Sequence, residues 1–316
     1  MSAPEIEVDP SPAQLPVPIN ADGIDNQTFS LQQDVSISYH DDSGYQTSTL
    51  SLNSLINQMD LHHEIFRLLL NEKLHLAPLD APRKVLDIGT GTGIWAIDFA
   101  DSYPSAEVIG TDISPIQPVY VPPNLKFEVD DAEADWVYAS DYFDFIHSRN
   151  IAQCISDWEK LMGQIYRCTK PGGYVELSEL GCVAFSDDET MAEDNAYKKC
   201  CELLNKTMET INRPWPVAGT LKARLEKAGF VDVHEVRFKQ PVGPWPKDKR
   251  LKQVGAMVML TSETGIEAYA LAAFTRYLTL SVEEATKVIE DAAKALKKKH
   301  SHMYTDFYVA YGRKPQ

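Results

Sequence analysis

Cysteine is scarce in this chain of 316 residues, and the cysteines present follow no structural pattern. They number five, with two adjacent: Cys154, Cys168, Cys182, Cys200 and Cys201. Disulfide frameworks use paired cysteines, and zinc sites use cysteine pairs at fixed short spacings. We therefore expect free thiols, no bound metal and a cytoplasmic protein.

Positive charge and long apolar runs are also scarce. The chain has 30 Lys and Arg against 46 Asp and Glu, a formal net charge of −16 at pH 7. Such a charge opposes phosphate backbones and anionic membrane surfaces. The longest uncharged apolar stretch, 254–261, is too short to span a bilayer, and residues 1–5 lack the basic start of a secretory signal. We expect neither a nucleic acid nor a membrane partner.

The most informative stretch is 85–95, where an apolar strand is followed by three alternating glycines. Glycines let the backbone approach a ligand closely, and the free N–H groups of a helix beginning near Ile94 favour polar or anionic groups. A dinucleotide fingerprint would need its third glycine at position 94, which disfavours NAD. The candidates for binding the polar end of another ligand are Asp87, Gly89, Thr90, Gly91 and Gly93.

Acidic residues end the next two predicted strands. The strand at 105–112 ends in Asp112, about 20 residues beyond the last glycine, where doubly wound folds place an acid against a ribose diol. An ionised carboxylate only accepts hydrogen bonds, so one side chain can take both hydroxyls. The strand at 125–129 runs into Asp130-Asp131-Ala132. There, Asp131 can accept from an adenine amino group, and Ala132 leaves room for the ring.

Four further strands are predicted at 143–148, 174–179, 231–238 and 304–311. Strands that alternate with helices and short turns are typical of a mostly parallel sheet with helices on both faces. We predict an α/β fold with a doubly wound, seven-stranded sheet, whose last strand is antiparallel and lies beside the sixth. Ligands of such folds gather beyond the carboxyl ends of the strands, which adds Ile113, Ser148 and Asn150 to the candidates.

These motifs, in this order, resemble the class I S-adenosylmethionine (SAM) methyltransferases. The segments 87–95, 114–118, 121–125, 130–133, 143–150 and 311–315 are similar to the LaeA-like methyltransferases of fungi. So is the lead-in at 60–63, although His62 stands where that family usually has glutamine. The resemblance covers nearly the whole chain. It implies SAM as cofactor and S-adenosylhomocysteine as product, favours Asp131 over Asp130 at the adenine, and suggests a contact for His63.

Composition divides the chain into four parts. Residues 1–35, rich in proline and acidic residues, are expected to form a disordered or loosely draped arm, followed by a helical cap at 36–80. The SAM-binding core spans 81–180. Residues 181–316 complete the sheet and carry helical insertions at about 185–216 and 245–302, which we expect to form a substrate lid over the methyl donor.

Three Ser-x-x-Glu capping boxes predict where helices begin, at Ser156, Ser186 and Ser281. They predict helices at 157–169, at about 188–212 and from 282, while Gly229 predicts the end of a helix at 217–228. The basic run at 294–300 allows a nuclear signal. We prefer to explain it as the end of the helix begun at Ser281, because cations there offset the helix dipole.

Methylation of an oxygen or nitrogen can require a base, typically a histidine or a carboxylate. His147 and Glu179 are the candidates, at the ends of the fourth and fifth strands, although a strand-end histidine is more often structural. The candidates for the substrate pocket are Tyr45, Arg149, Trp215 and Trp245. For Arg149, pairing with a neighbouring carboxylate is an equal alternative, and the two tryptophans could instead anchor rigid loops.

The sequence thus predicts a SAM-dependent methyltransferase that acts on a small natural product, at oxygen or nitrogen, in fungal secondary metabolism. Two alternatives stay open. One is a LaeA-like regulatory protein that acts in a complex with partner proteins, with a nuclear location. The other is a methyltransferase-fold protein that catalyses a non-methylating reaction. The sequence identifies no acceptor, and it leaves a homodimer open.

Overall fold

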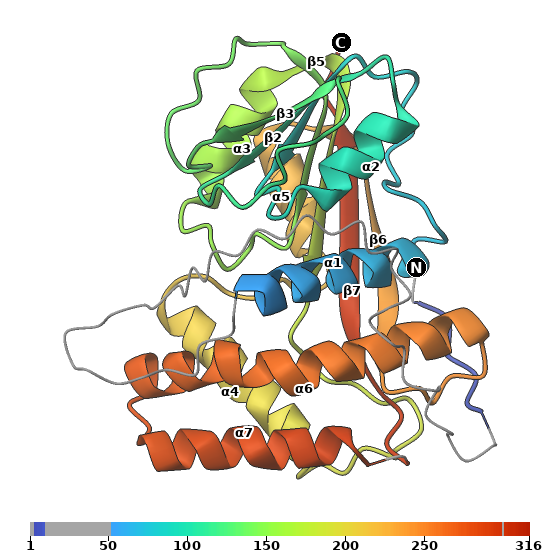
Figure 1. Ribbon diagram of the computed structural model, residues 1–316, viewed down its shortest axis with the longest axis vertical. Coiled ribbons are helices and arrows are strands. Elements are labelled where there is room, and N and C mark those ends of the chain that lie inside the picture. The colour runs from blue at the N-terminus through green and yellow to red at the C-terminus, as the bar shows by residue number, and fades with distance from the viewer. Residues whose placement is uncertain (1–2, 10–51, 299) are drawn as a thin grey trace.

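The computed structural model describes residues 3–9, 52–298 and 300–316, and its centre is a seven-stranded sheet (Figure 1). The strand order is β3-β2-β1-β4-β5-β7-β6. The first five strands in this order are parallel neighbours, and β7 runs antiparallel to both β5 and β6. The predicted doubly wound sheet with an antiparallel last strand is confirmed. The strands are β1 (Lys84–Ile88), β2 (Glu107–Asp112), β3 (Leu125–Val129), β4 (Phe143–Arg149), β5 (Thr169–Leu180), β6 (Val231–Val242) and β7 (Met303–Arg313).

Helices cover both faces of the sheet because successive residues of the buried strands point to opposite faces. Val85 of β1 belongs to a core with α2 (Ile94–Ser102). Its neighbour Leu86 belongs to a second core with α3 (Trp158–Cys168) and α5 (Thr220–Ala228). The near-continuous apolar runs of these strands are therefore buried on both sides, as is typical of parallel sheets.

A third group of helices lies beyond the sheet, where the insertions were predicted (Figure 1). It consists of α4 (Ala196–Thr210), α6 (Lys249–Tyr277) and α7 (Val282–Leu296), which share one apolar core with the long strand β7. The helix α1 (Leu52–Leu69) crosses between this group and the sheet, and its Phe66 ring stacks on Phe307 of β7 with centroids 4.5 Å apart. Closure of these helices over a ligand stays a prediction.

Helix starts only partly follow the predicted capping boxes. The box at Ser281 is confirmed, with both of its reciprocal hydrogen bonds. The box at Ser186 is wrong: its hydroxyl donates to Asp188, and α4 begins later because Asn195 accepts from the N–H groups of residues 197 and 198. At α3 the cap is Asp157, since the N–H and hydroxyl of Ser156 both donate to a glutamate in the loop after β3.

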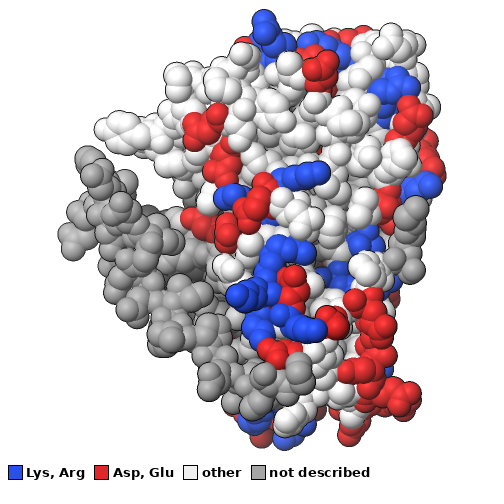
Figure 2. Space-filling model, turned by 90° about the vertical axis from the view of Figure 1, so that its right-hand side faces the viewer, with Lys and Arg blue, Asp and Glu red and all other residues white. Residues whose placement is uncertain are grey.

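The described part of the N-terminal arm is attached to the loop between β6 and α6. Val8 forms an antiparallel bridge with Pro246, and Lys247 lies 3.2 Å from the Glu7 carboxylate. Figure 2 shows lysines and arginines interspersed with acidic side chains on this side of the molecule. The rest of the arm, residues 36–51 of the cap and the candidate Tyr45 lie outside the described residues. No helix among the described residues is long and apolar enough to cross a membrane.

A buried carboxyl on β5 fixes the segment that joins α1 to β1. Glu176 is fully buried and accepts from the N–H groups of Leu76 and Ala77 at 2.8 and 2.7 Å, while its second oxygen has no partner among the described residues. Burial raises the pKa of Glu176 to about 7. A carboxyl whose pKa is raised by folding stabilises the fold at low pH, and this contribution is lost as the pH rises through 7.

The variant Glu176→Gln should remove this pH dependence, because the amide keeps the accepting oxygen and cannot ionise. Relative to the parent, its free energy of unfolding should rise by about 2 kcal/mol between pH 5 and pH 8. Urea unfolding at the two pH values measures the difference. The substitution of the exposed Glu209 by glutamine is the control, and its free energy of unfolding should change with pH as that of the parent does. Parallel curves for Glu176→Gln as well would contradict the prediction.

Candidate cofactor and substrate site

The turn between β1 and α2 requires glycine at three positions. Gly89, Gly91 and Gly93 have φ values of 65, 59 and 83°, a region that residues with a Cβ atom rarely adopt. A Cβ atom at Gly93 would lie 2.3 Å from the ring of Phe127 on β3. The turn leads directly into α2 at Ile94, as predicted.

Asp87 and Thr90 shape this turn from within. Asp87 is buried, and its two carboxylate oxygens accept from the hydroxyl of Thr90 at 2.6 Å and from His147 Nδ1 at 2.8 Å. His147 is buried as well and stacks on the ring of Trp95, with centroids 3.7 Å apart. Burial lowers the pKa of His147, so its ring is neutral and donates to Asp87 through Nδ1. These contacts place the predicted base His147 behind the turn, as a support for Asp87.

Asp112 lies beside the turn at the end of β2. One carboxylate oxygen accepts from the N–H of Gly91 at 2.8 Å, and the other accepts from the N–H of Ser114 at 2.9 Å. Each carboxylate oxygen can accept a further hydrogen bond. Gln117 reinforces the contact by donating to the carbonyl of Gly91 at 2.6 Å and to that of Ser114 at 2.9 Å.

The ends of β2 and β3 are adjacent, so the predicted ribose and adenine residues are neighbours. Asp112 pairs with Val129 in the sheet, and the N–H of Asp130 donates to the Asp112 carbonyl at 3.1 Å. Asp131 is exposed, and its carboxylate accepts from the N–H of Glu133 at 2.9 Å. Ile113 is 71% exposed, an apolar surface at the point where a purine ring would lie.

Polar residues at the ends of β4 and β5 complete this edge. Ser148 is fully buried, and its hydroxyl has no hydrogen-bond partner in the described part of the chain. Asn150 has a φ of 56° and accepts from the N–H of Leu180 at 3.1 Å, which joins the two strand ends. The predicted base Glu179 is buried beside them. One of its oxygens accepts from the N–H of Ile151 at 3.0 Å, and burial raises its pKa to about 7.

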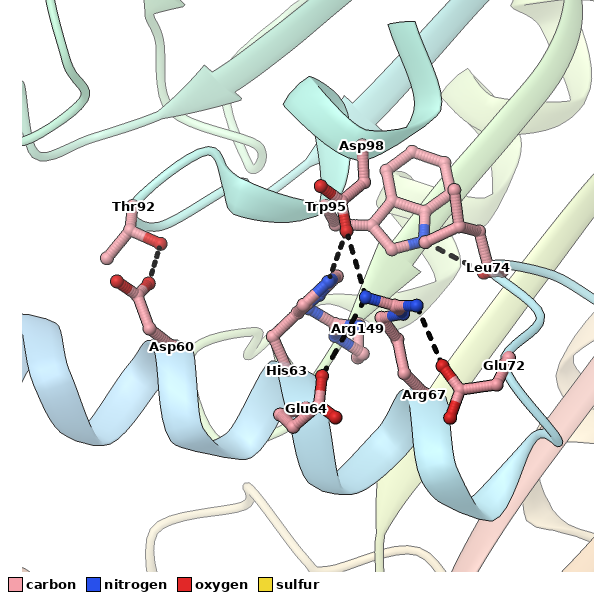
Figure 3. Close-up of polar contacts among 10 residues, drawn as sticks. All are labelled: Asp60, His63, Glu64, Arg67, Glu72, Leu74, Thr92, Trp95, Asp98 and Arg149. Carbon is pink, nitrogen blue, oxygen red and sulfur yellow. Dashed lines mark hydrogen bonds and ion pairs between the residues drawn. The ribbon is translucent and has the colours of Figure 1, made fainter. Parts of the chain in front are cut away.

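Helix α1 covers the same edge through polar contacts (Figure 3). Asp60 accepts from the Thr92 hydroxyl in the glycine turn at 2.8 Å. His63 is buried and lies between Asp98 of α2, 2.9 Å from its Nε2, and Arg149 of β4, 3.0 Å from its Nδ1. Three separate elements therefore meet at His63, one of the predicted cofactor residues.

The remaining substrate candidates lie apart from this edge or at its margin. Trp245 lies beyond the far end of β6, where its Nε1 donates to the carbonyl of Met303 at 2.9 Å. It lines a cavity of about 390 Å³ with Met259 of α6 and Leu296 of α7. Trp215, in the loop between α4 and α5, is partly buried. The structure thus brings Arg149 to the edge that α1 covers, but not Trp245.

Several residues of the site were not predicted. Asp60 and Gln117 lie in segments that carry the family resemblance, which is the one signal that could have identified them. Asp98 has no such signal. No group of three or more His, Cys, Asp or Glu among the described residues could hold a metal ion.

Comparison with known proteins agrees with the fold and shows the family. Residues 61–235 match the methyltransferase domain family. The methyltransferase pytC of Aspergillus terreus is 39% identical over 82% of this chain and 80% of the relative. The secondary metabolism regulator LAE1 of Cochliobolus heterostrophus is 34% identical over 82% of this chain and 87% of the relative.

A solved structure shares the fold at low sequence identity. It is the phosphoethanolamine N-methyltransferase 2 of Haemonchus contortus in complex with S-adenosyl-L-methionine, with a TM-score of 0.50 and 19% identity. The match covers 84% of this chain and 57% of that chain. The family match and the fungal relatives identify the chain as a member of the class I SAM-dependent methyltransferases, within the LaeA-like fungal family.

Proposed function

We propose that this protein transfers the methyl group of SAM to an oxygen or nitrogen of a small natural product in fungal secondary metabolism. The observation that carries the proposal is the convergence of the glycine turn, Asp112 and Asp131 on one edge of the sheet. A relative named as a methyltransferase, pytC, aligns over most of this chain and supports it. The formal net charge of −16 favours a small-molecule acceptor over nucleic acid.

The residues at this edge fit SAM. The three turn glycines adopt positive φ values, and a turn of this kind lets the backbone approach a ligand closely. Asp112 retains lone pairs for the two ribose hydroxyls, and Asp131 would accept from the adenine amino group. The exposed Ile113 offers an apolar surface to the purine, and the unpartnered Ser148 hydroxyl is available to a polar group of the ligand.

The chain's chemical task is positioning and, for some acceptors, proton transfer. SAM, when bound, supplies an electrophilic methyl group. The chain must hold the acceptor at near-attack distance in a site with little water, an effect that contributes several kcal/mol. Glu179 is better placed than His147 to take a proton, because its pKa of about 7 and its unpartnered oxygen suit a base at neutral pH. His147 is already engaged by Asp87.

A regulatory function is the second candidate, and the observation that favours it is the LAE1 relative. Both functions would keep the cofactor site, so cofactor binding alone does not separate them. A regulator would form a stable complex with partner proteins and would release no S-adenosylhomocysteine with any small molecule.

The test is methyl transfer to fungal metabolites. The purified protein is incubated with SAM and metabolite extracts, and mass spectrometry follows S-adenosylhomocysteine and products that have gained one methylene unit. We expect both signals to appear together and to depend on the enzyme. Cofactor binding without either signal, combined with a tight complex in size-exclusion chromatography with partner proteins, would favour the regulator. Failure to bind SAM would reject both functions.

A further inference from the structure

Arg149 is a partly buried cation at the site without a carboxylate partner. It is the last residue of β4, and its Nη2 lies 3.0 Å from Nδ1 of His63. The guanidinium also lies over the Phe66 ring, 5.1 Å from its centroid. Among the described residues no acidic side chain comes within ion-pair distance of it, although the carboxylates of Asp87 and Asp98 act on its charge from farther away. Burial lowers the pKa of Arg149 to about 10, which reflects an environment that disfavours its charge.

Arg67 in the same view has the opposite surroundings (Figure 3). It lies one turn along α1 from His63, and three carboxylates surround it. Glu72 is 2.7 Å away, Glu64 is 3.8 Å away and Asp98 is 3.9 Å away. The two arginines at this interface therefore differ in their partners: Arg67 is paired directly with carboxylates, and Arg149 has none within ion-pair distance among the described residues.

His63 holds Arg149 in place without supplying the missing charge. Arg149 can only donate, so Nδ1 of His63 must accept, and the proton lies on Nε2, which donates to Asp98 at 2.9 Å. Burial lowers the pKa of His63, which keeps its ring neutral. A guanidinium removed from water beside a neutral ring is unfavourable unless an anion joins it. The fixed guanidinium retains donors for such an anion.

We propose that Arg149, oriented by His63, is the receptor for a carboxylate of a ligand bound at this edge of the sheet. The planar guanidinium matches a carboxylate through two parallel hydrogen bonds. The end of β4 lies beside the end of β1, where the glycine turn starts. The carboxylate is therefore that of the methionine part of SAM or one on the acceptor. The inference rests on the proposed function and assigns the ligand group that this site recognises.

Binding measurements with two nucleosides distinguish the sources. S-Adenosylhomocysteine carries the amino-acid carboxylate, and methylthioadenosine lacks it. If Arg149 binds the cofactor, Arg149→Gln should lower the affinity for S-adenosylhomocysteine by about tenfold or more and leave the affinity for methylthioadenosine unchanged. If it binds the acceptor, both nucleosides should bind as in the parent. Benzoate is the probe for an acceptor carboxylate. It should then bind to the parent protein that is saturated with S-adenosylhomocysteine, and this binding should be lost in Arg149→Gln.

Matched variants keep the test decisive. Arg67→Gln removes the same charge from the same interface and should change none of the three affinities. Arg149→Lys keeps the charge but loses the planar guanidinium, so it should lower the affinity for the same ligand less than Arg149→Gln does. If thermal melting shows that Arg149→Gln is unfolded, Arg149→Lys takes its place in the test. His63→Gln can still accept from Arg149 and donate to Asp98, so it should preserve the carboxylate preference that His63→Leu loses.

The inference is overturned if the Arg149 variants bind all three probes as the parent does. Equal weakening of both nucleosides would also overturn it, because that result describes a damaged nucleoside pocket and not a carboxylate receptor. A parent protein that binds neither nucleoside would instead reject the proposed function.

Discussion

Replacing Asp112 by alanine should weaken SAM binding by about two orders of magnitude. The carboxylate is placed to accept both ribose hydroxyls, and hydrogen bonds to a charged group contribute about 1.5–3 kcal/mol each. Their joint loss, about 3 kcal/mol or more, corresponds to roughly a hundredfold in the dissociation constant. Isothermal titration calorimetry with SAM and with S-adenosylhomocysteine measures the effect.

Two controls separate the ribose contact from other effects of this substitution. Asp112 also accepts from the N–H groups of Gly91 and Ser114, so thermal melting must confirm that the variant remains folded. Asp130→Ala removes a carboxylate from the adjacent strand end and should leave the affinity close to that of the parent. If Asp112→Ala binds SAM as tightly as the parent, or if Asp130→Ala weakens it equally, the ribose assignment fails.

The fold could be predicted from the sequence because the patterns that indicate its strands and turns are local and repeated. Each central strand is an apolar run, and the glycine turn at Gly89, Gly91 and Gly93 follows the first one. Helix starts were less accessible where neighbouring residues compete for the same role. The capping box at Ser186 fails because Asp188 takes its hydroxyl, whereas Asn195 supplies the cap. Asp188 lies inside the four-residue pattern, and its contact with the distant His302 is a tertiary interaction that the pattern does not contain.

The candidate site divides in the same way. Asp112 and Asp131 could be named from their positions at the ends of strands, because parallel strands bring their carboxyl ends to one edge. The contact of Arg149 with His63 joins two residues from β4 and α1, and no spacing in the sequence predicts it. Trp245, in contrast, was predicted as a site residue but lies away from the site. It was predicted to line the substrate pocket, and it does line a cavity, but one formed by the end of β6 with α6 and α7.

Gly93→Ala should have the largest effect on stability, because it combines two independent costs. Gly93 has a φ of 83°, and a residue with a Cβ atom in this region costs about 1–3 kcal/mol. The new methyl group would also lie 2.3 Å from the Phe127 ring, and overpacking of this kind costs about 1–3 kcal/mol. We expect the free energy of unfolding, measured in urea, to fall by about 3 kcal/mol. Binding of S-adenosylhomocysteine should fall with it.

A second substitution separates the two costs. In the Phe127→Leu protein the ring is gone, but the backbone strain of a residue at position 93 remains. Gly93→Ala should therefore lower the free energy of unfolding less in the Phe127→Leu protein than in the parent. Gly163→Ala is the matched control: Gly163 lies within α3, and a Cβ atom there meets nothing within 4 Å. This control should gain about 0.5–1 kcal/mol, the ordinary advantage of alanine over glycine in a helix. A Gly93→Ala protein as stable as the parent would mean that the turn adopts another conformation, and the site built on it would have to be redrawn.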